Sequence, residues 1–403
     1  MSFLLLGWQA LLHNPDRHMT ELSPQPPIPT GTLREIAREF LRLGFVAYGG
    51  PPAHFAMMEE IFVRRLAWLS RERFLDLVGA VNLLPGPSST ELTIYIGEVR
   101  GGLPGLFVAG LCFILPSAFL VLGLAWAYVK FGALPNVAAL LFGVKAIVVA
   151  LIVQAIWNLA RSAFKSVFLT ILVVFVVALS FLGLPVLLLL VASGLANILY
   201  RQTASSKRLG TAVPLALATQ GAVSISSVGL LPLFLYFLKV GAVLFGSGFV
   251  LLAFLRADLV VKLHWLTDSQ LLDAIAVSQA TPGPFFTVST FIGFLLGGWK
   301  GALLATIGMF VPAFVYVAAT ASFLPKLRKS PIAGAFLDGV NAGAVALMAY
   351  ISWQFARSAI VNVQTFLIAL AGVVLLIKFK FNSAWLVLGA AAVSILLRLI
   401  GWV

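Results

Sequence analysis

The fold is decided by Asn82-Leu-Leu-Pro85-Gly86-Pro87-Ser88-Ser89-Thr90-Glu91, which returns later in the chain as Gln279-Ala-Thr-Pro282-Gly283-Pro284-Phe285-Phe286-Thr287. Pro282 follows Pro85 by 197 residues, and each Pro-Gly-Pro interrupts an apolar segment that otherwise favours a helix. Proline ends one helix by removing a backbone donor, and it is well tolerated where the next helix starts. The repeated interruption therefore predicts two homologous halves, each containing a broken helix.

The duplication extends beyond the prolines. Phe40–Gly44 aligns with Phe237–Gly241 at the same spacing, and 14 of the 29 positions in Pro135–Ala163 are identical to Pro331–Ala359. Two homologous halves with broken helices in matching places are typical of secondary transporters. The sequence thus predicts a transporter built from an internal repeat.

We expect the chain to divide into four parts: a flexible N-terminal tail over 1–33, a first repeat over 34–200, a linker over 201–231 and a second repeat over 232–403. The tail contains a proline-rich stretch, which is typical of extended or flexible chain. Its opening apolar run is too short to cross a bilayer and lacks the features of a signal peptide. We assign the tail no function.

Composition places the chain in a membrane. Hydrophobic residues make up 61% of it, charged residues only 10%, and its mean hydropathy is +1.04, whereas soluble domains carry roughly 25% charged residues. Several apolar runs reach the ~20 residues that a helix needs to cross a bilayer. These observations predict an all-α polytopic protein that passes several times through a membrane. The apolar runs are Leu103–Val129, Val137–Leu159, Val167–Phe181, Pro185–Tyr200, Ala302–Leu324, Ile332–Phe355, Thr365–Ile377 and Ala384–Leu397.

Other classes of protein fit poorly. The net charge of +13 is explained by lysine and arginine on cytoplasmic loops, and no basic segment resembles a nucleic-acid-binding module, so we expect no nucleic-acid partner. The single cysteine, Cys112, excludes an internal disulfide and a cysteine-based metal cluster, and we expect no metal or cofactor. Neither H-E-x-x-H nor G-x-S-x-G occurs, which argues against an enzyme. A Walker-type phosphate loop is also missing, which argues against ATP as the direct energy source.

Loop charges predict that the two halves lie in opposite orientations. The loop Arg64–Arg73 carries four arginines, whereas the equivalent Lys262–Gln270 is only weakly basic. At the next pair of equivalent loops the bias reverses: only Lys130 stands near Pro135, but three cations lie in 326–329. Because cations accumulate on cytoplasmic loops, the halves form an inverted repeat. This scheme works best if 74–99 enters the membrane and returns as a helical hairpin broken at Pro-Gly-Pro.

Each Pro-Gly-Pro is a candidate anion site. A broken helix exposes backbone groups that hydrocarbon cannot satisfy, so the break must face protein or water. With Pro87 or Pro284 in the first turn of the next helix, free N–H groups and the positive end of the helix dipole would face a ligand. Ser88, Ser89 and Thr90 add hydroxyl donors in the first half, but only Thr287 does so in the second. The alternative is that each break is a simple kink.

A second break lies at Tyr48-Gly49-Gly50-Pro51-Pro52, followed by His54, and its equivalent is Phe245-Gly246-Ser247-Gly248. Glycines allow close approach of the backbone, and a proline can begin the next helix. His54 has no counterpart because Leu251 replaces it, and its imidazole could bind an anion or exchange a proton near neutral pH. The alternative is a structural histidine.

Several further polar residues fall at membrane depth. Lys145 lies among apolar residues and is the strongest candidate cation for a bound anion; the alternative is an ion pair with a membrane-embedded acid. Glu91, beside Thr90, is a candidate proton-coupling carboxylate. Asn82 and Gln279 occupy equivalent positions before the two breaks, where their amides could orient backbone or ligand. Asp76 and its equivalent Asp273 are expected to cap a helix or form ion pairs.

These motifs together resemble the chromate ion transporter family, from about Phe40 to the C-terminus. The resemblance is carried by Tyr48-Gly-Gly-Pro-Pro-Ala-His54, by Asn82–Glu91, by Gly110-Leu-Cys-Phe-Ile-Leu-Pro116, by Leu251-Leu-Ala-Phe-Leu-Arg256 and by Thr281-Pro-Gly-Pro284. It implies efflux of chromate across the bacterial cytoplasmic membrane, with sulfate as a related anion. Ser88 stands where many members have asparagine, and Pro52 replaces a small residue; both leave the substrate range open.

The expected partners are therefore a small tetrahedral oxyanion (chromate or sulfate) and the lipid bilayer. Alternating access around a site near the midplane would carry the anion, driven by an ion gradient or by anion exchange. A passive anion channel and a carrier for sulfate or molybdate are the alternatives. The sequence leaves open the direction of transport, the coupling ion and the oligomeric state, a homo-oligomer included.

Overall fold

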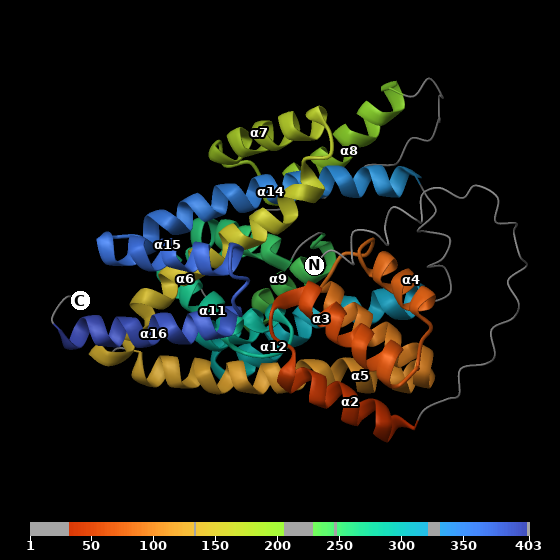
Figure 1. The fold of residues 1–403 in the computed structure, drawn as a ribbon, viewed down its shortest axis with the longest axis horizontal. Coiled ribbons are helices and arrows are strands. Elements are labelled where there is room, and N and C mark those ends of the chain that lie inside the picture. The colour runs from red at the N-terminus through yellow and green to blue at the C-terminus, as the bar shows by residue number, and fades with distance from the viewer. Residues whose placement is uncertain (1–31, 133, 205–228, 246–247, 321–330, 401–403) are drawn as a thin grey trace, which may run out of the picture.

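The computed structural model describes residues 32–132, 134–204, 229–245, 248–320 and 331–400. Throughout these ranges the regular structure is helical, and most of the long helices follow the long axis of the molecule (Figure 1). The first half contains α2 (Leu33–Val46), α3 (Gly50–Met58), the π-helix η1 (Glu59–Arg65), α4 (Arg71–Val81), α5 (Ser88–Phe131), α6 (Pro135–Ala163), α7 (Val167–Phe181) and α8 (Val186–Ala204). The second half contains α9 (Leu230–Val243), η2 (Gly248–Val250), α10 (Leu251–Leu255), η3 (Arg256–Lys262), α11 (Asp268–Ala280), η4 (Phe285–Thr287), α12 (Val288–Thr320), α14 (Pro331–Ala359), α15 (Val363–Ile377) and α16 (Ser383–Leu399).

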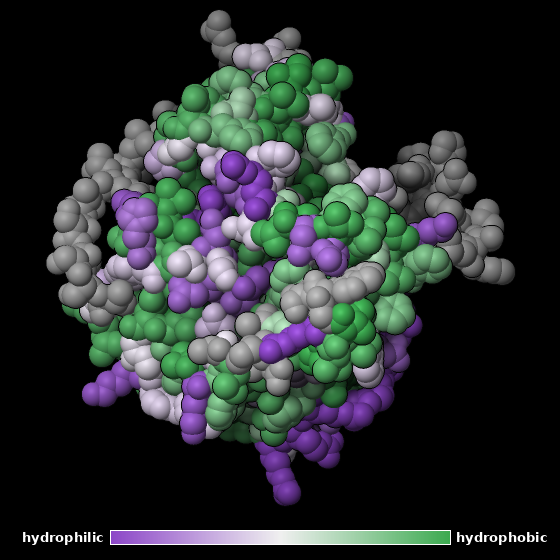
Figure 2. Space-filling model, turned by 90° about the vertical axis from the view of Figure 1, so that its left-hand side faces the viewer, coloured by the Kyte–Doolittle hydropathy of each residue, from purple (hydrophilic) through white to green (hydrophobic). Residues whose placement is uncertain are grey.

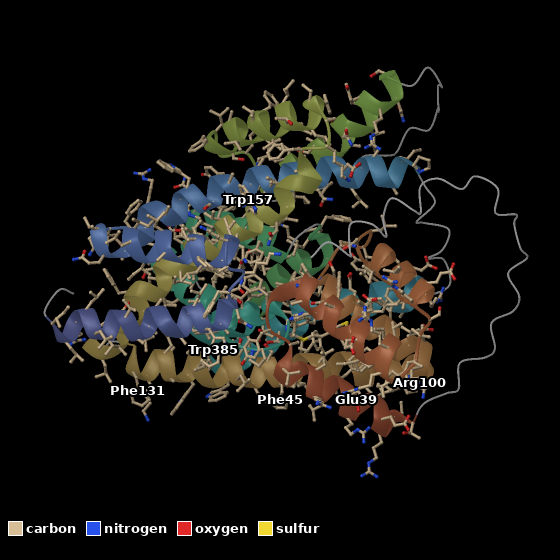
Figure 3. The ribbon with its side chains drawn as sticks, viewed as in Figure 1. Glu39, Phe45, Arg100, Phe131, Trp157 and Trp385 are labelled. Carbon is tan, nitrogen blue, oxygen red and sulfur yellow. The ribbon has the colours of Figure 1, made fainter. Side chains whose placement is uncertain are left out.

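The helices confirm the prediction of an all-α membrane protein. Within the described ranges, five helices are long and apolar enough to cross a bilayer: α5, α6, α8, α12 (with η4) and α14. The apolar helices α7, α9, α15 and α16 are shorter. Large apolar side chains face outward, as a lipid environment requires, with Phe131, Trp157 and Trp385 among them (Figure 3). Most of the predicted tail lies outside the described residues, α8 runs on to Ala204, and α9 begins at Leu230.

The first half begins with a helical hairpin made of α2, α3 and η1. Its two arms lie side by side: the rings of Phe40 and Phe62 stack with centroids 4.7 Å apart, and Arg65 pairs with the buried Glu39 at 3.1 Å. Glu39, labelled in Figure 3, belongs to α2. Because α2 has only fourteen residues, or about 21 Å of helix, the hairpin turns back before it could cross a bilayer. We call residues 47–50 the α2–α3 tip.

The second hairpin of the first half turns at the predicted Pro-Gly-Pro. The chain enters through α4 and leaves through residues 88–100 of α5, which we call the first arm of α5. The arm ends beside the start of α4, because the guanidinium of Arg100 lies 4.9 Å from the ring centroid of Trp68, just before that helix. The predicted return of 74–99 is therefore confirmed. We call residues 85–87 the α4–α5 tip.

Helix α5 then reverses direction a second time. Gly101 and Gly102 leave the helical conformation (φ −139°, ψ 16° and φ 61°, ψ −154°), and residues 103–131 fold back as a second arm. The two arms approach so closely that a Cβ on Gly97 would lie 2.4 Å from the carbonyl oxygen of Gly105. This long second arm is the one that crosses the molecule.

The second half repeats these features. Gly297 and Gly298 have nearly the same angles (φ −145°, ψ 16° and φ 60°, ψ −149°), so α12 also consists of a first arm and a second arm, 299–320. A Cβ on Gly293 would again lie 2.4 Å from a carbonyl oxygen, that of Gly301. The duplication seen in the sequence is thus preserved in the backbone. We call residues 282–284 the α11–α12 tip.

The equivalent second arms of α5 and α12 run in opposite directions, as an inverted repeat requires. Phe107, near the start of one, stacks on Phe314, near the end of the other, with ring centroids 5.6 Å apart. At the far end of the α5 arm, Tyr128 packs on Phe291 at 5.2 Å. Phe291 belongs to the first arm of α12, which is tied to the beginning of the second arm by the Thr290–Thr306 hydrogen bond of 2.7 Å.

The remaining helices interlock the halves. α6 of the first half packs against α15 and α16 of the second, and α14 of the second half packs against α7 and α8 of the first (Figure 1). One apolar core includes buried residues of both halves. The face on which α16 ends shows hydrophilic side chains gathered near its middle among apolar ones (Figure 2).

The inverted repeat makes a prediction about labelling from the two sides of a membrane. In a Cys112→Ala background, single cysteines at Arg65 and Lys262, which end the equivalent helices η1 and η3, are expected to react from opposite sides with a membrane-impermeant maleimide. The physical reason is that equivalent helices run antiparallel. Labelling of both positions from the same side would contradict the inverted arrangement, and a cysteine in the 201–204 segment serves as a reference for one side.

Candidate functional site

The broken-helix tips are joined across the two halves by a reciprocal pair of backbone hydrogen bonds. The N–H of Gly86, in the α4–α5 tip, donates to the carbonyl of Leu244 at 2.7 Å, where α9 ends. The N–H of Gly283, in the α11–α12 tip, donates to the carbonyl of Ala47 at 2.7 Å, where α2 ends. Gly86 and Gly283 are equivalent, as are Ala47 and Leu244. A two-fold relation produces such exchanged contacts.

Both tip glycines are required by backbone conformation and by space. Gly86 has φ +139° and Gly283 has φ +92°, and residues other than glycine rarely adopt these values. A Cβ on Gly86 would lie 2.5 Å from Oε1 of Glu91, and a Cβ on Gly283 would lie 2.7 Å from Cβ of Ser117. The tips are therefore close-packed against polar side chains.

The helix after the first break starts one residue later than predicted. Pro87 is the N-cap of α5 and Ser88 its first residue, while the carbonyl of Pro87 accepts from the N–H groups of Thr90 and Glu91 at 2.8 and 3.0 Å. Pro284 caps η4 in the same manner. Each proline thus precedes the first turn of its helix, and its carbonyl accepts the hydrogen bonds that complete that turn. The first N–H groups of a helix have no partner within it, so those of Ser88 and Ser89 point out of the helix start.

Three buried polar side chains follow this helix start. Ser89 is 4% exposed, and Thr90 and Glu91 are fully buried. Among the described residues, neither Thr90 Oγ1 nor either carboxylate oxygen of Glu91 has a hydrogen-bond partner. Buried polar atoms without partners are rare and costly in native proteins. They make this helix start a candidate ligand site.

The second helix start is covered by aromatic rings. Phe285 stacks on Phe249 with centroids 5.5 Å apart, and the ring of Phe286 lies against Gly248. The buried hydroxyl of Thr287 is within hydrogen-bonding distance of Ser117 Oγ, at 2.9 Å, and donates to Pro284 O, also at 2.9 Å. Thr287 is therefore engaged within the protein, whereas its equivalent Thr90 has no partner in the described part of the chain.

The α2–α3 tip contributes His54. Gly49 and Gly50 have positive φ angles (100° and 75°), and Pro51 occupies the first turn of α3, as predicted. His54 is 1% exposed, and its Nε2 lies 3.3 Å from Ala47 O, the oxygen that also accepts the bond from Gly283. Its Nδ1 has no partner among the described residues. His54 thus shares an acceptor with the tip of the opposite half.

The equivalent tip of the second half is only partly described. Gly246 and Ser247 lie outside the described residues, so their predicted role stays a prediction. Gly248 begins η2 and is buried. Its neighbour Phe286 occupies the space beside it.

Lys145 forms an ion pair with Asp273 of the other half. Its Nζ lies 3.3 Å from Asp273 Oδ1 and donates to Ser269 Oγ at 2.6 Å, and Tyr128 donates to Asp273 Oδ2 at 3.0 Å. Asp273 is almost completely buried, and Lys145 is partly exposed. Of the two alternatives for Lys145, this conformation shows the ion pair. It also confirms that Asp273 has a pairing role.

The two predicted amides lie at the ends of the helices that lead into the tips. Asn82 is the C-cap of α4 and is exposed, and Gln279 is half-buried in the last turn of α11. The structure thus brings Gly86, Ser89, Thr90, Glu91 and the end of α9 together in one group. Gly283, Thr287, His54 and Ala47 form the equivalent group, to which Ser117 also belongs.

Sequence reasoning missed Ser117. It directly follows Pro116, a proline that the two halves share, and it is a hydroxyl within an apolar helix. A hydroxyl beside a proline that both halves share could have identified Ser117 as a candidate. Its contact with Thr287, however, joins positions 170 residues apart and requires the folded structure.

Two interlocked, oppositely oriented halves with broken helices that meet across their interface define a membrane transporter with an inverted repeat. The sequence profile of the family described as chromate transporter matches residues 34–198 and 231–395. The chain belongs to this family.

Curated relatives agree with the profile. The chain is 33% identical to the chromate transport protein of Cupriavidus metallidurans over 395 residues, which cover 93% of this chain and 98% of that protein. It is 32% identical to a probable chromate transport protein of Synechococcus elongatus, covering 86% and 90% of the two chains. It is also 32% identical to the chromate transport protein of Pseudomonas aeruginosa, covering 82% of each. No solved structure shows significant similarity to this chain.

Proposed function

We propose that this protein is a secondary transporter that exports chromate across the bacterial inner membrane by alternating access, driven by an ion gradient or by anion exchange. Sulfate, which has the same tetrahedral shape and charge, is the related substrate. The observation that carries the proposal is the reciprocal docking of the two broken-helix tips, Gly86 on Leu244 and Gly283 on Ala47. Since each tip is completed by the opposite half, rocking of the halves would open the region between them toward one side or the other.

The anion site that we propose lies at the start of α5. The outward-pointing N–H groups of Ser88 and Ser89 and the hydroxyl of Thr90, which has no partner in the described part of the chain, would donate to an oxyanion, and the positive end of the helix dipole would attract it. The buried hydroxyl of Thr90 and carboxyl group of Glu91, which have no partners among the described residues, independently support a ligand here.

Glu91 is proposed as the proton-coupling group. A carboxylate buried beside an anion would repel it, so binding favours a neutral Glu91 that carries a proton. One proton would then leave with the anion, so export would still carry net negative charge outward and would be driven by the membrane potential, which is negative inside. His54 is a second candidate, because its Nδ1 has no partner among the described residues and it belongs to the group around Gly283. Lys145 could contact an anion only in a conformation that releases it from Asp273.

The test is uptake of labelled chromate and sulfate into inverted membrane vesicles, with pH and potential gradients imposed separately. Saturable uptake that responds to the pH gradient is the expected result. Linear, unsaturable flux would indicate a channel, and a response to neither gradient would leave only anion exchange. A preference for sulfate or molybdate over chromate would overturn the substrate that we propose.

The two equivalent threonines provide a prediction with a built-in comparison. Thr90→Val is expected to raise KM for the anion about tenfold, because a lost hydrogen bond to a charged group is worth about 1.5–3 kcal/mol. Thr287→Val is expected to leave KM nearly unchanged and to lower protein stability, because its hydroxyl bonds to Ser117 and Pro284. Equal effects of both substitutions on KM would contradict a site at the start of α5. Uptake kinetics and thermal unfolding in detergent measure the two effects.

A further inference from the structure

Three titratable side chains follow one another on the same face of the first arm of α5. Glu91, Tyr95 and Glu98 are spaced by four and then three residues, which places them in one row along a helix. The row covers about 10 Å, from 1.5 Å per residue. It leads from the α4–α5 tip to the end of the arm near Arg100.

Burial decreases along this row. Glu91 is fully buried and Tyr95 is 1% exposed, whereas Glu98 is only partly buried. Tyr95 lies within electrostatic range of both glutamates. Tyr316 lies within that range of Glu91, and the cationic Arg73 within that range of Glu98. The row therefore connects a buried carboxyl group to a partly exposed one.

The second half has no such row. Val288 follows Thr287 as Glu91 follows Thr90, and Phe291 and Phe294 stand where Tyr95 and Glu98 stand. Because only one of the two copies has the polar row, the row is expected to serve a function that is specific to the first half. An apolar equivalent also shows that the fold does not need these polar groups for packing.

The hydroxyl of Tyr95 is held by the opposite half. It is hydrogen-bonded to Oγ1 of Thr320, at the end of α12. Thr320 Oγ1 itself donates to Tyr316 O at 2.6 Å, and because it has only one proton, Tyr95 must be the donor to Thr320. In this conformation the proton of Tyr95 points away from the row.

We propose that Glu98 and Tyr95 form the path by which a proton reaches Glu91, and that Thr320 closes this path. The proposal rests on the proposed coupling role of Glu91. In the transfer step, Tyr95 releases its hydroxyl proton to the Glu91 carboxylate and takes a proton from the Glu98 carboxyl, directly or through water. Glu98 ends ionised and Glu91 neutral. Because Tyr95 and Thr320 belong to different halves, the movement of one half against the other breaks their bond and opens the path.

Tyr95 and Thr320 should therefore give opposite results when their hydroxyls are removed. In proteoliposomes containing a pH-sensitive dye, Tyr95→Phe is expected to slow proton movement driven by chromate at least tenfold, within the range of acid–base contributions. Chromate–chromate exchange, which moves no net proton, is expected to remain near the original rate. In the absence of chromate, Thr320→Val is expected to raise the rate of proton leak severalfold, because the hydroxyl of Tyr95 is released. Glu98→Gln should resemble Tyr95→Phe.

The matched control is Tyr236→Phe, which removes a buried hydroxyl that donates to Phe254 O in the second half. It is expected to change neither proton movement nor exchange. The path would be overturned if Tyr95→Phe lost both exchange and proton movement. It would also be overturned if Thr320→Val lost transport without any proton leak. Either result would mean that the Tyr95–Thr320 bond is structural. If Glu91→Gln leaves proton coupling intact, the coupling role of Glu91 fails as well, and that result is distinguishable from failure of the path alone.

Discussion

Gly86→Ala and Gly283→Ala are each expected to lower chromate transport about a hundredfold. A side chain in the positive-φ region costs about 1–3 kcal/mol, and Gly86 and Gly283 have φ angles of +139° and +92°. The added methyl would also lie 2.5 Å from Glu91 Oε1 in one case and 2.7 Å from Ser117 Cβ in the other. The tip would have to move, and its hydrogen bond to the opposite half would be lost. Initial rates of uptake per amount of folded protein measure this effect.

The matched control is Gly183→Ala. Gly183 also has a positive φ, +77°, but a Cβ there would meet no atom within 4 Å. This substitution introduces the backbone strain without disturbing a tip, so transport by the folded protein should be unchanged. Elution as a single species from a size-exclusion column shows that each variant is folded. If the tip variants transport as well as Gly183→Ala, tip docking is not required for function.

Breaking the Lys145–Asp273 pair is expected to have the second large effect. Removing one member of a buried ion pair typically costs about 3–5 kcal/mol, because the other charge is left uncompensated. Asp273 has a side chain only 2% exposed, so Lys145→Met is expected to destabilise the protein strongly and to abolish transport. The exchanged pair Lys145→Asp with Asp273→Lys should recover stability, since the opposite charges remain together. Thermal unfolding and uptake are the measurements.

The pair of Lys165 with Asp338 is the control. Its lysine is 51% exposed, and Asp338 stays paired with Arg201 at 2.6 Å when the lysine is removed, so Lys165→Met should be nearly silent. The double variant Lys145→Met with Asp273→Leu separates the two interpretations of Lys145. Recovery of transport would show that the lysine serves the ion pair. Recovery of stability without transport would show that its charge is also needed by the anion.

Much of the fold could be predicted because it depends on local chemistry. Apolar runs and Pro-Gly-Pro breaks determine where helices exist and where they stop, and the return of the chain after Pro85–Pro87 followed from loop charges. The reversal at Gly101–Gly102 was not predicted, although both glycines recur in the second half. Two adjacent glycines within an apolar segment are compatible with a kink and with a complete reversal of chain direction.

The site was harder to predict because its contacts join distant residues. The acceptors of the Gly86 and Gly283 bonds are main-chain carbonyls, which leave no signature in a sequence. The partner of Lys145 was left open between an anion and an acid, because only the folded chain brings α11 of one half to α6 of the other. Thr90 and Thr287 looked equivalent by alignment, and their different hydrogen bonding follows from neighbours on other helices.

The bonds that join the tips connect backbone to backbone, and this has an evolutionary consequence. Leu244 and Ala47 accept through their carbonyls, so their side chains were free to change after the gene was duplicated. The two copies could therefore diverge, one keeping hydroxyl and carboxyl groups and the other acquiring phenylalanines, without losing the joint between them. A symmetrical ancestor of two identical subunits could have used the same joint before either copy became specialised.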